Sequence, residues 1–553
     1  MNKQTANVMS GGEAMMRAAV DLGCDTVFGI PGAQTYPLFD AMHRLGVRCI
    51  TPRHEQSAAY MAMGYARSTG STGVFSVVPG PGILNASAAL CTAMGTCTPL
   101  VGLTGQVPST FLGQGRGHLH ELADQPGTLK TLIKDAMQIT DPELAQTQTL
   151  AAFERARSGR PGPVTVEMCW DTMAQACEQQ ATLTASAPVP QPDEASLEAA
   201  VRLIKSARKP MIMCGGGAQH ASVAVLALAE RLNAPVTAFR SGRGVVAEDH
   251  PLGIGSVGAR ILWDDVDLLI GIGSRCEMPT MRWQSMMRYD AQLTGGRKLL
   301  RIDIDPTQME RLVPDVGLVT DAAHGCQLLL ERLTGPLSPD SVRRSEIAAA
   351  RKRAMNALES LTPHAGYLRI IRRHLPRDGI FVPELCQIGF TSYTDAFPVL
   401  APRTYLTEGY QGTLGFGFPT ALGAKIACPD RTVLSVCGDG GFMFGVQELA
   451  TAAQYGIGLI TLVFNNGAYG NVKRDQQTVF EGRVIGSDLP SPDLMKLAES
   501  FGVRGVRVTT PDELDRALPQ WMANDQPVLV EVRCDLATET PPWRFIHMAT
   551  CPV

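Results

Sequence analysis

Two short polar turns in the C-terminal part of the chain carry residues that could bind a metal ion and phosphate. The turns are GDGG at 438–441 and NNG at 465–467. Asp439 and Asn466 each offer a side-chain oxygen, and Mg²⁺ prefers one carboxylate together with neutral oxygens, water and substrate phosphates. The glycines allow backbone N–H groups to approach phosphate oxygens. The two turns therefore predict a Mg²⁺–diphosphate site.

The elements around these turns should place them at one edge of a sheet. Residues 432–437 and 459–464 are apolar runs that predict buried strands, and residues 446–455 between them have helical spacing. A strand–helix–strand unit produces parallel strands, so the turns at the ends of the two strands lie at the same carboxyl edge. We therefore expect Asp439 and Asn466 to point into one crevice.

The order GDG, residues 441–464 and then NN closely resembles the thiamine diphosphate (ThDP) fingerprint of the acetohydroxyacid synthase and benzaldehyde lyase superfamily. This resemblance implies side-chain metal ligands at Asp439 and Asn466 and a third ligand in the backbone carbonyl of Ala468. It also implies that the glycines of the first turn contact the cofactor, namely Gly438, Gly440 and Gly441.

Glu55 carries the second chemical signal. A carboxyl group at the start of a helix is favourable there simply because of the helix dipole. Beside the ThDP fingerprint, however, the segment PRHEQSAAYMAMGYAR at 52–67 resembles the superfamily segment that holds the cofactor-activating glutamate. There the carboxyl group hydrogen-bonds N1′ of the aminopyrimidine and favours the imino form that removes the thiazolium C2 proton. The glyoxylate carboligase branch lacks this glutamate.

A glycine-rich segment at 405–419 precedes a helix of small residues, and its glycines permit the backbone to lie against a flat ligand. The resemblance makes it the aminopyrimidine loop. It implies that the Gly412 carbonyl accepts a hydrogen bond from the 4′-amine. Leu414 would buttress the bent cofactor where most relatives carry methionine.

The residues that would select the substrate have weaker sequence signals than the residues that would bind the cofactor. Gln34 occupies the position of a pocket histidine in benzaldehyde lyase and could hydrogen-bond a substrate carbonyl. In HLHELADQ at 118–125, an extended chain would place His118 and His120 on one face. His120 or Glu121 is the candidate for proton transfer, with Gln114 as a further one; the alternative is a solvated loop.

Acetohydroxyacid synthases carry a tryptophan near the position of Val472. The absence of this tryptophan disfavours a housekeeping branched-chain amino-acid synthase.

The whole chain alternates predicted strands and helices, which indicates an α/β protein with three Rossmann-like, doubly wound parallel-sheet domains. We place a pyrimidine-binding domain at 1–180, a central domain at 190–340 and a diphosphate-binding domain at 360–553. An Ala-, Pro-, Ser- and Thr-rich linker lies at 181–195. The tail at 538–553 contains aromatic residues that we interpret as surface packing.

The central domain resembles one that holds FAD in acetohydroxyacid synthases and is structural in most decarboxylases. Arg275 fits the FAD-binding segment of the synthases, but the paired aspartates of that segment are absent. The sequence therefore leaves FAD open.

Composition excludes several classes of partner. The 553 residues are 45% hydrophobic and 18% charged, with a net charge of −4 and no Lys/Arg-rich run, so we expect no nucleic acid. No uncharged apolar run reaches about 18 residues, so we expect no membrane span. Fourteen scattered cysteines without a CxxC pair favour the cytoplasm over a disulfide framework.

The resemblance implies a ThDP-dependent carboligase or lyase (acetolactate synthase-like) that makes or breaks C–C bonds of small 2-oxo acids or 2-hydroxy ketones. It also implies a homodimer or homotetramer with active sites at the subunit interface. The alternatives are a 2-oxo acid decarboxylase, a C–C hydrolase of 1,2-diketones, or a catalytically silent ThDP-binding subunit.

Overall fold

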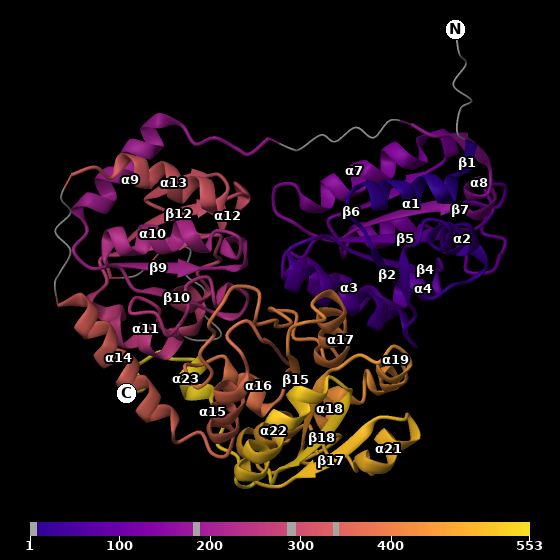
Figure 1. Ribbon diagram of the computed structural model, residues 1–553. Coiled ribbons are helices and arrows are strands. Elements are labelled where there is room, and N and C mark those ends of the chain that lie inside the picture. Colours follow the sequence, from indigo (N-terminus) through magenta and orange to yellow (C-terminus); the bar gives the residue numbers. More distant parts are fainter. Residues whose placement is uncertain (1–7, 181–187, 285–292, 294, 336–341) are drawn as a thin grey trace.

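The computed structural model describes residues 8–180, 188–284, 293, 295–335 and 342–553. These form three lobes, each built on a parallel sheet with helices on its faces (Figure 1). The predicted α/β fold with three doubly wound parallel-sheet domains is confirmed. Of the predicted linker at 181–195, residues 181–187 lie outside the described residues. Within the described ranges, no helix is both long and apolar enough to cross a membrane.

The N-terminal sheet has the order β3-β2-β4-β5-β7-β6, with all strands parallel. Helices α1, α2 and α7 pack on one face and α3 and α5 on the other. The bounds are β2 (Thr26–Gly29), β3 (Arg48–Ile50), β4 (Gly73–Val77), β5 (Leu100–Gln106), β6 (Asp135–Ile139), β7 (Val164–Cys169), α1 (Gly11–Asp21), α2 (Tyr36–Arg44), α3 (Glu55–Thr69), α4 (Pro81–Asn85), α5 (Ser87–Gly95), α6 (Gln125–Lys130) and α7 (Ala145–Arg157). An antiparallel pair, β1 (Val8–Ser10) and β8 (Ala176–Glu178), closes the lobe.

The central sheet has the order β10-β9-β11-β12-β13, again all parallel. The strand order reverses between β9 and β11, which makes the carboxyl ends of these two strands a topological switch point. The bounds are β9 (Pro210–Cys214), β10 (Val236–Ala238), β11 (Leu268–Ile272), β12 (Lys298–Asp303), β13 (Val316–Val319), α9 (Glu194–Ser206), α10 (Ser222–Leu232), α11 (Ser256–Leu262), α12 (Thr307–Arg311), α13 (Ala322–Arg332) and α14 (Arg343–Leu358).

The C-terminal sheet has the order β14-β15-β16-β18-β17, all parallel, so the two strands that precede the polar turns are direct neighbours. The bounds are β14 (Ile380–Pro383), β15 (Val433–Gly438), β16 (Ile460–Asn465), β17 (Arg504–Val508), β18 (Val528–Arg533), α15 (His364–His374), α16 (Gln387–Ser392), α17 (Gly417–Ala427), α18 (Asp439–Phe442), α19 (Leu449–Gln454), α20 (Gly470–Val479), α21 (Leu494–Ser500) and α22 (Pro511–Asn524).

Helices α3 and α17 join the N-terminal and C-terminal lobes at backbone distance. A Cβ atom added at Gly64 would lie 2.0 Å from the carbonyl oxygen of Thr420. One added at Gly423 would lie 1.9 Å from the carbonyl oxygen of Met61. Both glycines are therefore required by the close approach, and the two lobes share one apolar core across it.

The C-terminal tail crosses to the central lobe, where the end of the chain lies beside α14 in Figure 1. In α23 (Trp543–Ile546), Phe545 is 1% exposed and belongs to the central core with Met548. The interpretation of the tail aromatics as surface packing is therefore wrong for Phe545. The sequence did not reveal this because the partners of Phe545 lie in another domain.

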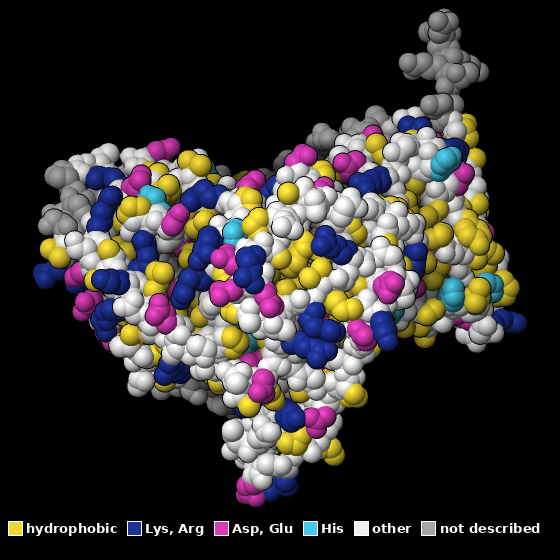
Figure 2. Space-filling model, turned by 60° about the horizontal axis from the view of Figure 1, so that its bottom comes forward, with side chains coloured by type: hydrophobic (Ala, Val, Ile, Leu, Met, Phe, Trp, Pro, Cys, Tyr) yellow, Lys and Arg dark blue, Asp and Glu magenta, His cyan; other side chains and the backbone are white. Residues whose placement is uncertain are grey.

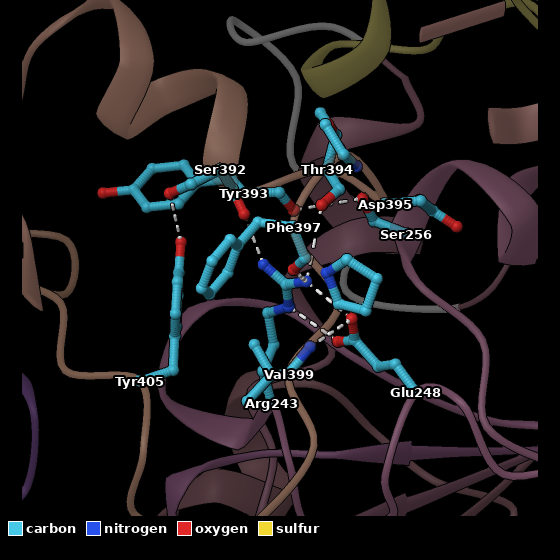
Figure 3. Close-up of polar contacts among 12 residues, drawn as sticks. Arg243, Glu248, Ser256, Ser392, Tyr393, Thr394, Asp395, Phe397, Val399 and Tyr405 are labelled. Carbon is cyan, nitrogen blue, oxygen red and sulfur yellow. Dashed lines mark hydrogen bonds and ion pairs between the residues drawn. The ribbon is translucent and has the colours of Figure 1, made fainter. Parts of the chain in front are cut away.

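Arg243 links the central and C-terminal lobes through a buried polar network (Figure 3). Its guanidinium donates to both carboxylate oxygens of Glu248, at 2.7 and 2.6 Å, and to the carbonyl oxygen of Phe397 at 2.6 Å. Asp395 of the C-terminal lobe also contacts the central lobe, where its carboxylate accepts a hydrogen bond from the backbone N–H of Val257 at 2.8 Å. Burial raises the pKa of Asp395 to about 6.

Replacing Arg243 by methionine should lower the free energy of unfolding by about 3–5 kcal/mol, because Glu248 would remain as an uncompensated buried charge. Urea unfolding would measure the loss. Arg377→Met is the matched control, since Arg377 pairs with Asp249 at 2.5 Å in solvent and should cost about 1 kcal/mol or less. Equal losses for the two variants would contradict the assignment.

Candidate functional site

The two polar turns of the C-terminal sheet lie against each other. Gly438 pairs with Phe464 in the register of β15 and β16, so the residues after these strands emerge side by side. The Asp439 carboxylate accepts hydrogen bonds from the backbone N–H of Gly467 and from the Ser491 hydroxyl, both at 3.0 Å. The predicted adjacency of the two turns is therefore present.

The donor atoms at these turns fit a small hard cation. Asp439 offers a carboxylate that is 5% exposed; burial raises its pKa, and the hydrogen bond from Ser491 opposes that rise. Asn466 offers an amide oxygen and Ala468 a backbone carbonyl. The described residues contain no group of three or more His, Cys, Asp or Glu side chains placed to hold a metal. A magnesium site of this kind does not require one, because Mg²⁺ accepts few protein ligands beside water and phosphate.

The glycines of the first turn have packing reasons as well as a predicted cofactor role. A Cβ atom at Gly440 would lie 2.6 Å from the Tyr469 ring, and one at Gly441 would lie 2.2 Å from a carboxylate oxygen of Glu384. One at Gly438 would lie 3.0 Å from Cβ of Cys386. A side chain at 440 or 441 would therefore displace the Tyr469 ring or the Glu384 carboxylate.

Glu384 is a site residue that the sequence reasoning missed. It lies directly after β14 and accepts hydrogen bonds from the backbone N–H groups of Gly415 at 2.5 Å and Gly417 at 3.2 Å. It therefore fixes the loop that carries Gly412 and Leu414, and Gly412 and Gly415 in that loop have φ of 65° and 78°. The available signal was an acidic residue directly after an apolar strand, the same signal that marks Asp439.

Glu55 begins α3 and lies half-buried at the edge of the N-terminal lobe. One of its carboxylate oxygens accepts a hydrogen bond from the Asn85 side chain at 3.0 Å. In the described part of the chain, this carboxylate bonds to no residue of the C-terminal domain. Nearby, the backbone N–H of Arg53 donates to the Glu448 carboxylate at 3.0 and 3.1 Å, which anchors the start of α3 to the C-terminal lobe. The sequence reasoning missed Asn85.

Gln34 and His120 lie together. His120 Nδ1 is 3.1 Å from Gln34 Oε1, and Gln34 Nε2 donates to the Leu119 carbonyl at 3.1 Å. Gln34 is 1% exposed. The expectation that His118 and His120 share one face of an extended chain is wrong, because His120 has a φ of 66° within a turn. His118 instead packs on the Phe111 ring at 4.9 Å.

Glu121 serves the turn rather than an open site. Its carboxylate accepts from the backbone N–H groups of His118 at 2.9 Å and Gly115 at 3.0 Å, and these bonds lower its pKa. Gln114 is exposed and donates to the Thr110 carbonyl at 2.6 Å. Of the four candidates in this region, Gln34 and His120 are thus the pair that the fold brings together.

A pocket lies at the switch point of the central sheet. Its walls include the turn at 215–217 after β9 and the turn at 273–275 after β11, with residues 95–97 and Tyr410 from the other two lobes. The Arg275 guanidinium stacks over the Tyr410 ring at 4.4 Å. Arg240 also lines the pocket, and its buried Nε and Nη1 have no hydrogen-bond partner in the described residues, while Nη1 lies 3.6 Å from the Glu277 carboxylate in an ion pair. These features suit an anionic ligand.

The fully buried Glu384 should make stability depend on pH. Burial raises its pKa from the ordinary value of 4.5 to about 7. The native state then holds a proton that the unfolded state releases, so the free energy of unfolding falls as pH rises from about 4.5 to 7, by about 3 kcal/mol. Glu384→Gln should remove this part of the slope in urea unfolding series at several pH values. A slope identical to that of the wild-type protein would refute the assignment.

Comparison with known proteins places this geometry in a family. Three family models match: "Thiamine pyrophosphate enzyme, N-terminal TPP binding domain" at 9–128, the central domain at 197–330 and "C-terminal TPP binding domain" at 387–532. The first of these contains Glu55, and the last contains Asp439 and Asn466.

Individual relatives cover nearly the whole chain. It is 32% identical to a probable acetolactate synthase large subunit of Methanocaldococcus jannaschii, over 96% of this chain and 93% of that protein. It is 33% identical to a probable 2-ketoarginine decarboxylase of Pseudomonas aeruginosa, over 96% and 95%. The solved 4-hydroxybenzoylformate decarboxylase of Rhodococcus jostii RHA1 superposes with a TM-score of 0.79 at 25% identity, covering 95% of this chain and 99% of that one. The chain therefore belongs to the thiamine diphosphate-dependent enzymes.

Proposed function

We propose that this protein is a ThDP- and Mg²⁺-dependent enzyme that makes or breaks a C–C bond next to the carbonyl of a small 2-oxo acid or 2-hydroxy ketone. The observation that carries this proposal is the contact between Asp439 and the turn at 465–467 within a matched ThDP-binding domain. When bound, ThDP supplies the electron sink for an acyl carbanion, which no side chain can supply at neutral pH.

Different residues of the chain would hold different parts of the cofactor. Asp439, Asn466 and the carbonyl of Ala468 would hold Mg²⁺, and Gly438, Gly440 and Gly441 would approach the diphosphate. The Gly412 carbonyl and the Leu414 side chain would hold the aminopyrimidine, in a loop fixed by Glu384.

Glu55 would exchange a proton with the aminopyrimidine ring nitrogen. The Asn85 side-chain amide donates to one oxygen of the Glu55 carboxylate. The other oxygen is then available to the ring nitrogen. The hydrogen bond also fixes the direction of the carboxylate, and general acid–base catalysis requires such positioning.

A second copy of the chain would complete the site, as a homodimer or homotetramer. Within one chain, Glu55 bonds to its own lobe rather than to the diphosphate lobe. Exposed apolar side chains adjoin several predicted site elements, and Figure 2 displays hydrophobic side chains gathered on the side of the N-terminal lobe. Such patches mark protein interfaces. The exposed apolar residues concerned are Leu84, Leu119, Met443, Phe444 and Val472, which are 40%, 59%, 41%, 51% and 54% exposed.

His120 would hold or move a proton at its Nε2 atom. Gln34 Nε2 donates to a carbonyl, so Gln34 Oε1 faces His120 as an acceptor and selects the Nδ1–H form of the imidazole. Nε2 then carries a lone pair, makes no hydrogen bond to the described residues, and can take up a proton and return it to a substrate. This capacity favours a second candidate function, 2-oxo acid decarboxylation, because that reaction ends with protonation at the former carboxyl carbon.

The central pocket supports a bound dinucleotide such as FAD. Its glycine turns at a switch point suit a diphosphate, and Arg240 adds a cation whose Nε has no hydrogen-bond partner among the described residues.

Incubation of the holoenzyme with pyruvate, with benzoin and with a 1,2-diketone, followed by product analysis, tests the proposed function. We expect a carboligation or cleavage product from at least one of them that depends on both ThDP and Mg²⁺. Glu55→Gln should abolish turnover and retain ThDP binding, because the residue acts on the proton rather than on the diphosphate. Unchanged turnover in this variant, or turnover without ThDP, would overturn the mechanism.

Purified protein should show flavin absorption bands, or acquire them when FAD is added. Arg240→Met should weaken flavin binding by removing a cation that lines the pocket, and fluorescence quenching of added FAD would measure this. The outcome that contradicts the flavin proposal is an absence of both bands and quenching in protein that binds ThDP.

A further inference from the structure

We propose that Glu539, in the C-terminal tail, is a positioning residue that fixes the side-chain amide of Asn466 with its oxygen toward the cation. This inference rests on the proposed Mg²⁺–diphosphate function and concerns a residue that lies 73 positions from the ligand it serves.

The contact is direct. Asn466 Nδ2 lies 3.3 Å from Glu539 Oε1 and 3.4 Å from Oε2. On the other side of the same amide, Asn466 Oδ1 accepts from the backbone N–H of Ala468 at 3.2 Å. The amide is thus held from both ends, with its nitrogen toward the tail and its oxygen toward the turn that also carries the Ala468 carbonyl.

Hydrogen-bonding capacity determines which end of the Asn466 amide faces the tail. An ionised carboxylate can only accept hydrogen bonds, whereas an amide presents a donor at one end and an acceptor at the other. Turning the Asn466 amide over would place its oxygen against the Glu539 carboxylate and its NH₂ group against the Ala468 N–H. Both contacts would become repulsive, and an N–H donor would face the cation. Glu539 therefore selects the orientation in which Asn466 can be a ligand.

Glu539 is itself held firmly. Its side chain is 2% exposed and lies 3.6 Å from the Arg474 guanidinium and 3.5 Å from His364 Nε2. The next residue, Thr540, is tied by its N–H to the Thr362 carbonyl at 2.9 Å and by its carbonyl to Gln387 Nε2 at 3.1 Å. A buried carboxylate with a guanidinium beside it and an anchored backbone can impose an orientation on its partner.

The adjacent asparagine has a parallel arrangement. Asn465 Nδ2 donates at 2.8 Å to Glu531 of β18, and Asn465 Oδ1 accepts from the Gly467 N–H at 3.1 Å. Both asparagines of the turn thus point their NH₂ groups at buried carboxylates and their oxygens at the turn. Partners behind a ligand commonly matter for metal affinity because they fix the direction of the donor atom.

The test compares wild-type protein with Glu539→Ala and Glu539→Gln by calorimetric titration of Mg²⁺ at saturating ThDP. We expect Glu539→Ala to weaken Mg²⁺ binding by about 10–100-fold, as is typical for loss of such a partner. Glu539→Gln should recover most of the affinity, since its amide oxygen can still accept from Asn466. Asp395→Asn is the control: it alters a buried carboxylate that accepts hydrogen bonds from the backbone of the central lobe rather than from Asn466, and should leave the Mg²⁺ affinity unchanged.

Thermal melts of the cofactor-free variants separate folding from binding, and Glu539→Met replaces Glu539→Ala in the titration if the smaller side chain prevents folding. Equal Mg²⁺ affinity in the wild-type protein and the folded Ala or Met variant would overturn the proposal. So would equal losses for Glu539→Ala and Glu539→Gln, because charge rather than orientation would then be responsible. If wild-type protein binds no Mg²⁺ with ThDP, the proposed function itself is overturned, and this inference with it.

Discussion

The backbone contact between α3 and α17 is the constraint on which the arrangement of the lobes depends. Gly64 and Gly423 remove the side chains that would hold the two helices apart, so the helices pack through main-chain atoms. Glu55 lies at the start of one helix, and the loop of Gly412 and Leu414 leads directly into the other. A single packing contact thereby sets how the helix that begins at Glu55 lies against the helix that follows the loop of Gly412 and Leu414.

Buried carboxylates position the polar parts of this chain. Glu384 accepts from the loop that carries Gly412 and Leu414, and Glu531 and Glu539 accept from the two asparagines. Glu167 accepts from Gln125, whose other end accepts from the Gly80 N–H. A carboxylate suits this purpose because it accepts several hydrogen bonds and donates none when ionised. Its burial is expensive, so each such residue fixes a neighbour only where hydrogen bonds or cations offset the cost.

Local patterns in the sequence were enough to predict the three sheets and the meeting of the two polar turns. Apolar runs that end in polar turns indicated the strands, and the rule that parallel strands end at one edge placed Asp439 beside the turn of Asn466. The pairing of Gln34 with His120 was less accessible: both were selected as candidates, but the left-handed φ of His120 removed the expected extended geometry.

Residues whose partners are distant in sequence escaped prediction. Glu384, Asn85 and Glu539 make their contacts 31, 30 and 73 positions away, and no periodicity records such pairings. Phe545 escaped for the same reason, since its core lies in another lobe. The role of each residue became evident only once the fold showed which residue it contacts.

The path of the C-terminal tail affects how the C-terminus of this protein can be modified. Residues 539–548 pass from behind the turn of Asn466 into the core of the central lobe, and the Arg353 guanidinium donates to the backbone carbonyl of Val553 at 3.0 Å. A purification tag at the C-terminus, or removal of C-terminal residues, would act on the same backbone segment that holds Glu539. We therefore expect changes at this end of the chain to disturb the contact between Glu539 and Asn466.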